Sequence, residues 1–227
     1  MKRILVLTVI LAALGSLAPL AMTAPEPYEV PTTWELDIDF VAPQPITLVL
    51  PGQKKPTTFW YMLYTVTNRT RDPQTGLGVE QGFVPEFTMY TNTGETFIAN
   101  KRPPAGVFNA IKKRHNNPLL QDHIQILGKL LFGKDNAKDG VAIWPDFSNK
   151  TVSIDVFVGG LSGETAELKL PRPIPITSTD INGVEVTEVK EKILLHKAMR
   201  LNFAIKGETS NRLYTTAKLV TKNWVLR

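Results

Sequence analysis

Residues 59–67, FWYMLYTVT, decide the fold of this chain. In an extended strand successive side chains point to opposite faces, so the apolar residues of this stretch divide into two sets. One face carries Trp60, Met62, Tyr64 and Val66, and the other carries Phe59, Tyr61 and Leu63. A strand that is apolar on both faces belongs inside a sheet that is covered on both sides. We therefore expect residues 59–67 to form the central strand of a layered β protein.

Short alternating segments flank this strand in both directions along the sequence. Period-two patterns occur at residues 34–40, 46–50, 83–90, 96–99, 140–144, 152–158, 166–170, 199–205 and 213–226. Many short strands separated by turn residues are typical of an antiparallel β-sandwich. Turn chemistry predicts a hairpin at 83–99, a turn at Asn182-Gly183, and a glycine-rich turn at 159–163 that folds 166–170 back onto 152–158. The proline-rich stretch 171–175 is expected to be a connector.

The period changes between residues 105 and 131. Apolar residues recur there at spacings of three and four, with a break at 115–118 (HNNP). This pattern predicts two short helices, or one helix and a helical turn, as an insertion around residues 105–132. Because strands and helices do not alternate regularly elsewhere, a doubly wound α/β fold is not expected. Residues 25–227 should therefore form a single, mainly β domain with a helical insertion.

Residues 1–24 have the pattern of a secretory signal peptide. Lys2 and Arg3 precede an uncharged apolar run at residues 4–14, and small residues follow up to Ala24. An uncleaved membrane anchor is the alternative, but Pro19 interrupts the apolar stretch and no cluster of Lys and Arg follows it. We expect an exported protein, periplasmic or extracellular, with no stable transmembrane anchor after signal cleavage.

Composition excludes several classes of function. The chain of 227 residues contains no cysteine, which rules out disulfides, thiolate metal sites and a thiol nucleophile. Its net charge of +5 includes Lys2 and Arg3, so the mature chain has 24 basic and 21 acidic residues, a net charge of +3. This charge is too small to indicate nucleic-acid binding. Because exported eukaryotic domains usually contain disulfides, a cysteine-free exported chain indicates a bacterial protein.

Four stretches together resemble a group of uncharacterised exported bacterial proteins with an immunoglobulin-like β-sandwich. They are residues 31–36 (PTTWEL), 59–68 (FWYMLYTVTN), 138–147 (KDGVAIWPDF) and 155–164 (DVFVGGLSGE). The resemblance covers most of the mature chain and implies an immunoglobulin-like fold. It implies no activity, ligand or site residue.

Two motifs with catalytic or metal-binding appearance each lack a required part. Residues 160–164 (GLSGE) follow a strand as a nucleophile elbow would, but Glu164 replaces the required glycine and a strand rather than a helix follows. Residues 135–146 resemble a calcium loop, but Ala137 removes one ligand. The three histidines show no spacing typical of a metal site. The sequence therefore predicts no catalytic residue, no metal and no cofactor.

Two groups of residues remain as candidate binding sites. A patch for an anionic polymer or lipid headgroup could be formed by Lys101, Arg102, Lys112, Lys113 and Arg114. The alternative role for the last three is to end a helix, where cations interact favourably with the helix dipole. A glycan could stack on exposed rings of Tyr61 and Trp224, whereas the other tryptophans alternate in phase with core positions.

The sequence as a whole favours an exported, non-catalytic interaction or structural protein of the cell envelope. Its expected partner is an envelope protein or a polysaccharide, and no nucleic acid. A glycan-binding module is the alternative, and a hydrolase that uses Ser162 is less favoured. The sequence leaves the oligomeric state open.

Overall fold

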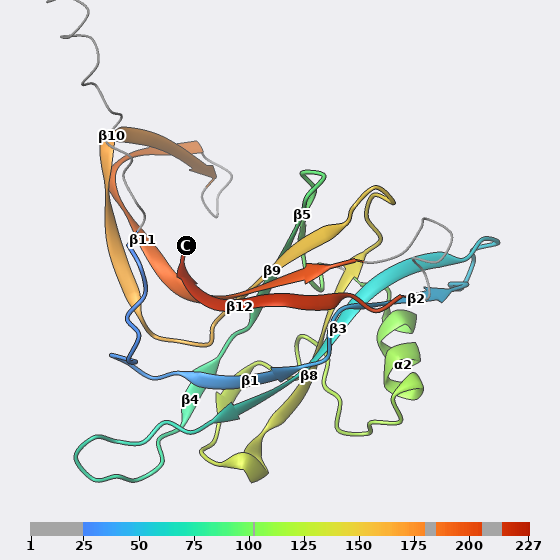
Figure 1. Cartoon of the computed structure of the whole chain (residues 1–227), viewed down its shortest axis with the longest axis horizontal. Coiled ribbons are helices and arrows are strands. Elements are labelled where there is room, and N and C mark those ends of the chain that lie inside the picture. Colours follow the sequence, from blue (N-terminus) through green and yellow to red (C-terminus); the bar gives the residue numbers. More distant parts are fainter. Residues whose placement is uncertain (1–24, 102, 180–184, 206–214) are drawn as a thin grey trace, which may run out of the picture.

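The computed structural model describes residues 25–101, 103–179, 185–205 and 215–227 (Figure 1). The expected signal peptide at 1–24, the Asn182-Gly183 turn and Arg102 lie outside these residues. Strands dominate the described part of the chain, and all of its sheet pairings are antiparallel.

The first sheet is built around β3 (Thr57–Asn68), which contains the stretch FWYMLYTVT. One edge of β3 pairs along most of its length with β8 (Lys138–Pro145). The other edge pairs first with β2 (Gln44–Leu48) and then with β1 (Leu36–Phe40). The predicted central position of this strand is confirmed.

The second sheet is built around the long strand β11 (Glu185–Ala204). Its other members are β5 (Glu86–Thr91), β6 (Thr96–Ile98), β9 (Ser153–Gly159), β10 (Thr165–Thr179) and β12 (Lys218–Leu226). The C-terminal half of β11 lies between β9 and β12, and β5 and β6 extend the sheet beyond β9 as the predicted hairpin. The N-terminal half of β11 pairs with β10.

The main core lies between these two sheets. Trp60, Met62 and Val66 from β3 belong to one cluster of buried residues with Val156 of β9 and Leu201 of β11. The buried side chains alternate with exposed or half-buried ones along β9, as expected for a strand with one face in the core. The structure is thus a mainly β, antiparallel fold with two sheets packed face to face.

A second, smaller core covers the other face of the first sheet. Helix α2 (Ala105–Arg114) buries Val107 and Ile111 in a cluster that includes Tyr61 and Ile143. The strand β3 is therefore covered on both faces, which explains its doubly apolar pattern. Within the described ranges, no helix is long and apolar enough to cross a membrane.

After α2 the described residues contain no second α-helix, and only a single helical turn is present, in which Ile126 N donates to Asp122 O at 3.1 Å. Residues 115–131 form turns and one short strand, β7 (Gly128–Leu130), which pairs with β4 (Gln81–Phe83), and the 3-10 helix η1 (Lys134–Asn136) follows. Leu119 and Ile124 are 75% and 67% exposed. Their spacing imitated the apolar face of a helix, although these side chains cover no core.

The expected hairpin between residues 152–158 and 166–170 is wrong. Strand β10 does not fold back onto β9, because β9 and β10 pair one after the other with the same strand, β11. The proline-rich residues 171–175 are not a connector but part of β10, where the register shifts between Lys169 and Ile174. Proline has no N–H to donate and is tolerated at such irregular edge positions.

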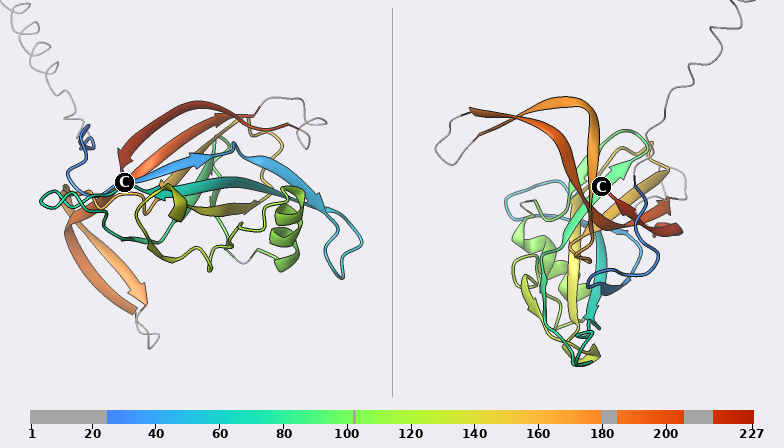
Figure 2. Two further views of the ribbon diagram at one scale, coloured as in Figure 1. Left: turned by 90° about the horizontal axis from the view of Figure 1, so that it is seen from below. Right: turned by 90° about the vertical axis from the view of Figure 1, so that its left-hand side faces the viewer.

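Strand β10 and the first part of β11 project from the sandwich as a curved two-stranded ribbon (Figure 1 and Figure 2). We call this ribbon, residues 165–179 and 185–196, the arm. Most of its described side chains beyond residue 170 are exposed. The arm therefore adds little to the core and is held at its base by the rest of the fold.

A test of the packing around β3 uses the glycine opposite Tyr64. Gly140 of β8 pairs with Tyr64, and a Cβ at residue 140 would lie 2.4 Å from Tyr64 Cζ and 2.5 Å from Ile126 Cδ1. We expect Gly140→Ala to reduce the free energy of unfolding by about 1–3 kcal/mol through overpacking, measured by urea unfolding. Gly82→Ala is the control, because a Cβ there meets nothing within 4 Å. Equal losses in both variants would contradict this packing.

Candidate binding cleft at the base of the arm

A cleft of about 630 Å³ lies where the arm leaves the sandwich. Its aromatic lining residues are Trp34 and Phe157, and its ionisable lining residues include Glu86, His196 and Arg227. Clefts of about 300–1,000 Å³ that combine aromatic side chains with a few polar groups are typical of ligand sites. Because its walls come from both ends of the chain and from three strands of the second sheet, the cleft exists only in the folded protein.

Two guanidinium groups lie over one aromatic ring beside this cleft. The Cζ atom of Arg227 is 4.6 Å from the ring centre of Phe157 and 5.5 Å from that of Tyr90, and Arg227 Nη2 donates a hydrogen bond to Tyr90 Oη at 3.1 Å. The Cζ atom of Arg200 is 6.0 Å from the Phe157 ring centre. Such contacts hold a cation over the electron-rich face of the ring. They fix the direction in which Phe157 and Arg227 face the cleft.

Arg200 is neutralised by a carboxylate, whereas Arg227 is not. Asp155 accepts hydrogen bonds from Arg200 Nε and Nη2 at 3.0 and 3.1 Å and from Asn202 at 2.9 Å. Burial alone would raise the pKa of Asp155, but the bonds from Arg200 and Asn202 and the Arg200 charge lower it overall. Among the described residues no carboxylate forms an ion pair with Arg227. Arg227 is therefore the cation that the cleft can offer to a ligand.

A buried ion network lies beside the cleft and is centred on Lys197, one of the residues that line it. Lys197 Nζ lies 2.6 Å from Glu35 Oε1 and 2.8 Å from Glu164 Oε2, and the Lys197 side chain is only 1% exposed. Lys197 also donates to Tyr28 O at 3.2 Å, and Glu164 accepts from Tyr28 N at 2.9 Å. The Lys197 ammonium lies 5.1 Å from the ring centre of Trp224. The network joins the start of the described chain to the bases of both arm strands.

The charges of this network perturb one another. Burial favours the neutral form of both groups, but the hydrogen bonds and the opposite charges outweigh it. The pKa of Glu164 is lowered overall by Lys197 and by the Tyr28 N–H, against the effect of burial. The pKa of Lys197 is raised overall by Glu164 and Glu35, again against burial. Both groups are therefore charged at neutral pH.

Residues 160–164 connect the two sheets rather than forming an elbow. Leu36 N donates to Leu161 O at 2.8 Å, and Gly163 N donates to Trp34 O at 3.2 Å. Ser162 Oγ accepts from Glu164 N at 3.1 Å. Ser162 and His196 both line the cleft, but in the described part of the chain no hydrogen bond joins them. Ser162 therefore has no base in place to activate it, as the failed motif indicated.

Two cations of the predicted basic patch donate hydrogen bonds to backbone carbonyl groups. Lys112 Nζ donates to Leu120 O at 2.9 Å, and Arg114 Nη1 donates to Pro45 O at 3.1 Å. Lys101, Lys113 and Arg114 are exposed, and Arg102 lies outside the described residues. Lys112 thus joins the loop at Leu120 to α2, and Arg114 joins α2 to β2. Anion binding by this patch stays a prediction.

The two aromatic residues expected to contact a glycan do not share an exposed face. Tyr61 is 0% exposed, because its ring lies in the core beneath α2, and its Oη contacts His115 Nε2 at 2.8 Å. Trp224 is half-buried against the main core. The prediction that Tyr61 offers its ring to a sugar is therefore wrong. The strand 59–67 is buried on both faces, which already argued against an exposed Tyr61.

The sequence analysis did not identify Tyr90, Phe157, Arg200 or Arg227 as site residues. A signal was present, because Phe157 and Arg200 occupy outward positions between core residues of β9 and β11. Which outward residues meet could not be predicted, since it depends on β11 pairing with β9 on one edge while β12 pairs with its other edge.

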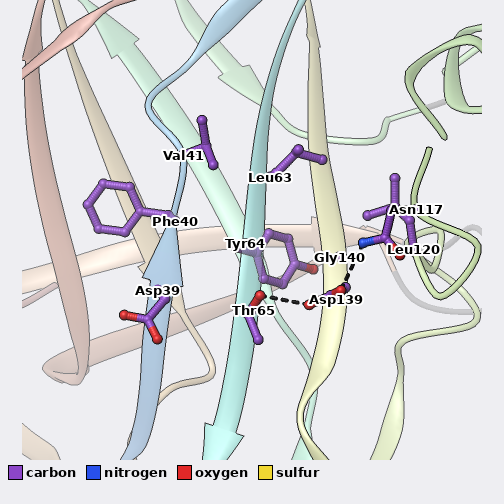
Figure 3. Close-up of a pocket in the computed structure, with 10 residues that line it drawn as sticks. All are labelled: Asp39, Phe40, Val41, Leu63, Tyr64, Thr65, Asn117, Leu120, Asp139 and Gly140. Carbon is purple, nitrogen blue, oxygen red and sulfur yellow. Dashed lines mark hydrogen bonds between the residues drawn. The ribbon is translucent and has the colours of Figure 1, made fainter. Parts of the chain in front are cut away.

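A smaller cavity of about 240 Å³ lies between β1, β3 and β8 (Figure 3). Two carboxylates line it, those of Asp39 and Asp139, and Asp139 accepts hydrogen bonds from Thr65 Oγ1 at 2.7 Å and Asn117 Nδ2 at 2.8 Å. Both Asp139 oxygens thus have partners within the protein. The cavity has less than half the volume of the cleft at the base of the arm.

The remaining observations add no further site. In the described ranges no group of three or more His, Cys, Asp or Glu residues is arranged to hold a metal ion. A scan against protein-family models, a search of curated proteins and a search of solved structures each found no match.

Proposed function

We propose that this protein is an exported, non-catalytic interaction protein of the cell envelope that binds its partner with the arm and the cleft at the base of the arm. Export is supported by residues 1–24, which have the pattern of a signal peptide. We further propose that the sandwich is immunoglobulin-like and that α2 belongs to an insertion between its strands, in line with the sequence resemblance.

The projecting arm is the observation that carries the proposal. A two-stranded ribbon is at best marginally stable in water on its own. The arm nevertheless leaves apolar side chains in solvent, with Ile174, Leu194 and Val189 45%, 55% and 67% exposed. Exposed apolar side chains on a projecting element favour contact with another macromolecule. The arm thus adds binding surface rather than core.

The base of the arm is built to hold it in place. The ion network of Lys197, Glu35 and Glu164 is buried, and breaking such a network is expensive because it leaves an unpaired buried charge. The cleft beside it presents Arg227 and Phe157 in fixed positions. A partner that contacts the arm would therefore also meet a preorganised surface at its base.

A glycan-binding module is the second candidate, and the aromatic lining of the cleft favours it. Trp34 and Phe157 both contribute to the cleft, and sugar C–H faces stack on aromatic rings. This candidate uses the cleft without the distal arm. Variants can therefore separate the two functions.

The test compares wild type with a variant whose distal arm is removed. Lys169 pairs with Lys192, so replacing residues 171–190 by Asn-Gly leaves a two-residue hairpin loop between Leu170 and Glu191. Each protein is cross-linked in an envelope extract, the cross-linked partner is identified by mass spectrometry, and its affinity for the purified proteins is measured. We expect the shortened variant to bind the partner at least about tenfold more weakly, because it loses most of the proposed contact area.

The controls are Phe157→Ala in the cleft and Lys113→Ala on α2, far from the arm in sequence. Lys113→Ala should bind the partner as wild type does. Binding of envelope polysaccharide that is lost in Phe157→Ala and retained in the shortened variant would favour the glycan-binding module. Equal partner binding by wild type and the shortened variant would refute the proposed role of the arm.

A further inference from the structure

One edge of β11 is paired with another strand along only part of its length. Residues 197–204 pair with β12 on this edge, and the last bonds of that ladder join His196 and Arg227 through their backbone N–H and C=O groups. Strand β10 pairs with the opposite edge of β11 from His196 to Glu185. In the described part of the chain no strand pairs with residues 185–195 on the β12 side. This open edge is a template for one more strand.

The sequence of this edge restricts which strand can fill it. In an antiparallel ladder, two opposed residues either both point their backbone N–H and C=O groups toward the other strand or both point them away. These two kinds of pair alternate along the strands. Two identical strands can therefore pair only in registers where one residue faces its own copy. A register centred on Glu188 or Glu191 would oppose two carboxylates, and one centred on Lys190 or Lys192 would oppose two ammonium groups.

Centring on Val189 gives a complementary pairing. The valine side chain, 67% exposed, would face its copy. On either side Glu188 of one strand would face Lys190 of the other, so the register contains two pairs of opposite charge. Across the arm these residues oppose Ile176 and Ile174 of β10 in the register, and within the described chain neither forms an ion pair. Their charges are therefore available to a second chain.

The register centred on Val189 also fits the space that is open. It pairs residues 185–193 with residues 193–185 of the copy. This segment lies within the open edge and stops before His196, whose backbone N–H and C=O groups are already bonded to Arg227. A register centred on Ile193 would oppose residues 190 and 196 and bring the second strand against the end of β12.

We propose that two copies of this chain associate through the open edge of β11, antiparallel and centred on Val189, to form a symmetric dimer with a continuous four-stranded arm. The contact is isologous, since the same residues of both copies contribute to it. This inference rests on the proposed role of the arm as the binding element and names a second copy as the partner of its β11 edge. The cleft remains available to a different ligand.

Charge reversal tests the register. In Glu188→Lys, two pairs of lysines would face each other, and in Lys190→Glu two pairs of glutamates. Each variant alone should dimerise roughly tenfold or more weakly than wild type in analytical ultracentrifugation, because two cross-strand pairs change from attraction to repulsion. An equal mixture of the two variants should restore dimers, as should the double variant Glu188→Lys/Lys190→Glu. A structural effect on one chain would not be reversed by mixing.

The absence of cysteine allows a second, independent test. Val189→Cys would place two thiols opposite each other at the centre of the dimer, within the distance at which a disulfide forms. Mild oxidation should give a covalent dimer of this variant, whereas Glu185→Cys, whose two thiols would lie far apart in the dimer, should give no covalent dimer.

A wild type that remains monomeric at high concentration would overturn the dimer, and charge-reversed variants that are not rescued by mixing would overturn the register. If dimers are absent but the envelope partner still depends on the distal arm, the proposed function stands without this inference. If dimers form and no envelope partner is found, the inference stands and the proposed function fails.

Discussion

Replacing Lys197 by methionine is expected to lower the free energy of unfolding at neutral pH by about 3–5 kcal/mol, the usual loss when one partner of a buried ion pair is removed. Methionine keeps the length of the side chain but leaves Glu164, which is 4% exposed, and Glu35, which is 21% exposed, without their cation. The loss is measured by urea unfolding. The same variant should loosen the N-terminal segment, because Tyr28 O loses its hydrogen bond from Lys197 Nζ.

The loss in Lys197→Met should depend on pH. In wild type the pKa of Glu164 is held below its ordinary value of 4.5, so its contribution to stability is complete above that pH and disappears as the pH falls through the lowered pKa. The pKa of Lys197 is held above 10.5, so its contribution is complete below that pH and disappears as the pH rises through the raised value. Without Lys197, burial raises the pKa of Glu164. Protonation of Glu164 then removes the unpaired buried charge that destabilises the variant. The deficit should be largest near neutral pH, begin to shrink above pH 4.5, where Glu164 of the variant takes up its proton, and shrink further below it as wild type loses the contribution of Glu164.

Lys129→Met is the matched control. Lys129 also forms an ion pair, with Glu80 at 2.6 Å, but its side chain is 75% exposed. Surface pairs of this kind contribute little to stability, so the unfolding midpoint should stay close to that of wild type at every pH. A Lys197→Met variant that unfolds like Lys129→Met, or a deficit that does not change with pH, would contradict the buried network.

Replacing Gly160 by alanine should give the second large loss. Its φ of +78° is a conformation that residues with a Cβ rarely adopt, and a Cβ there would lie 2.3 Å from Val84 O. The left-handed conformation costs roughly 1–2 kcal/mol, and forcing an extra carbon against backbone costs about 1–3 kcal/mol. We expect a total loss of about 2–5 kcal/mol in urea unfolding. The cleft should deform as well, because Val84 and Gly160 both line it.

The neighbouring glycine offers a control on the same strand. Gly159 ends β9 without a positive φ, and a Cβ there would lie at an ordinary 3.6 Å from Glu86 Cβ. Gly159→Ala should change the free energy of unfolding by no more than about 1 kcal/mol, since only the entropy of the unfolded chain is altered. Similar losses at both positions would show that the turn conformation of Gly160 does not limit stability.

The sequence predicted the parts of the fold in which side-chain patterns report burial. The doubly apolar stretch in β3 and the alternation in β9 each identified a strand and its buried face correctly. The sequence did not predict the strands of the arm, because both faces of the arm lie in solvent. Residues 185–192 mix Glu, Lys, Val and Thr without alternation, and no periodicity can arise where no face is buried. The prolines of β10 further concealed a strand that tolerates them only at an irregular edge.

The candidate site was harder to predict, because it depends on contacts between distant parts of the chain. Lys197 finds Glu164 across 33 positions and Tyr28 across 169. Nothing near Lys197 in the sequence indicates a carboxylate partner. Arg227 reaches Tyr90 across 137 positions. Such pairs become visible only when the order of strands in the second sheet is known.

The position of β11 in the sheet also determines when the protein can fold during synthesis. Strands β5 and β9 are complete by Gly159, but the strand that joins them to β10 and β12 ends only at Ala204, and β12 ends at Leu226. Long-range pairings of this kind form slowly, because the intervening chain must be ordered first. The second sheet therefore cannot close until β12 has left the ribosome. A chain that stays open so late is suited to crossing a membrane unfolded, as the proposed export would require.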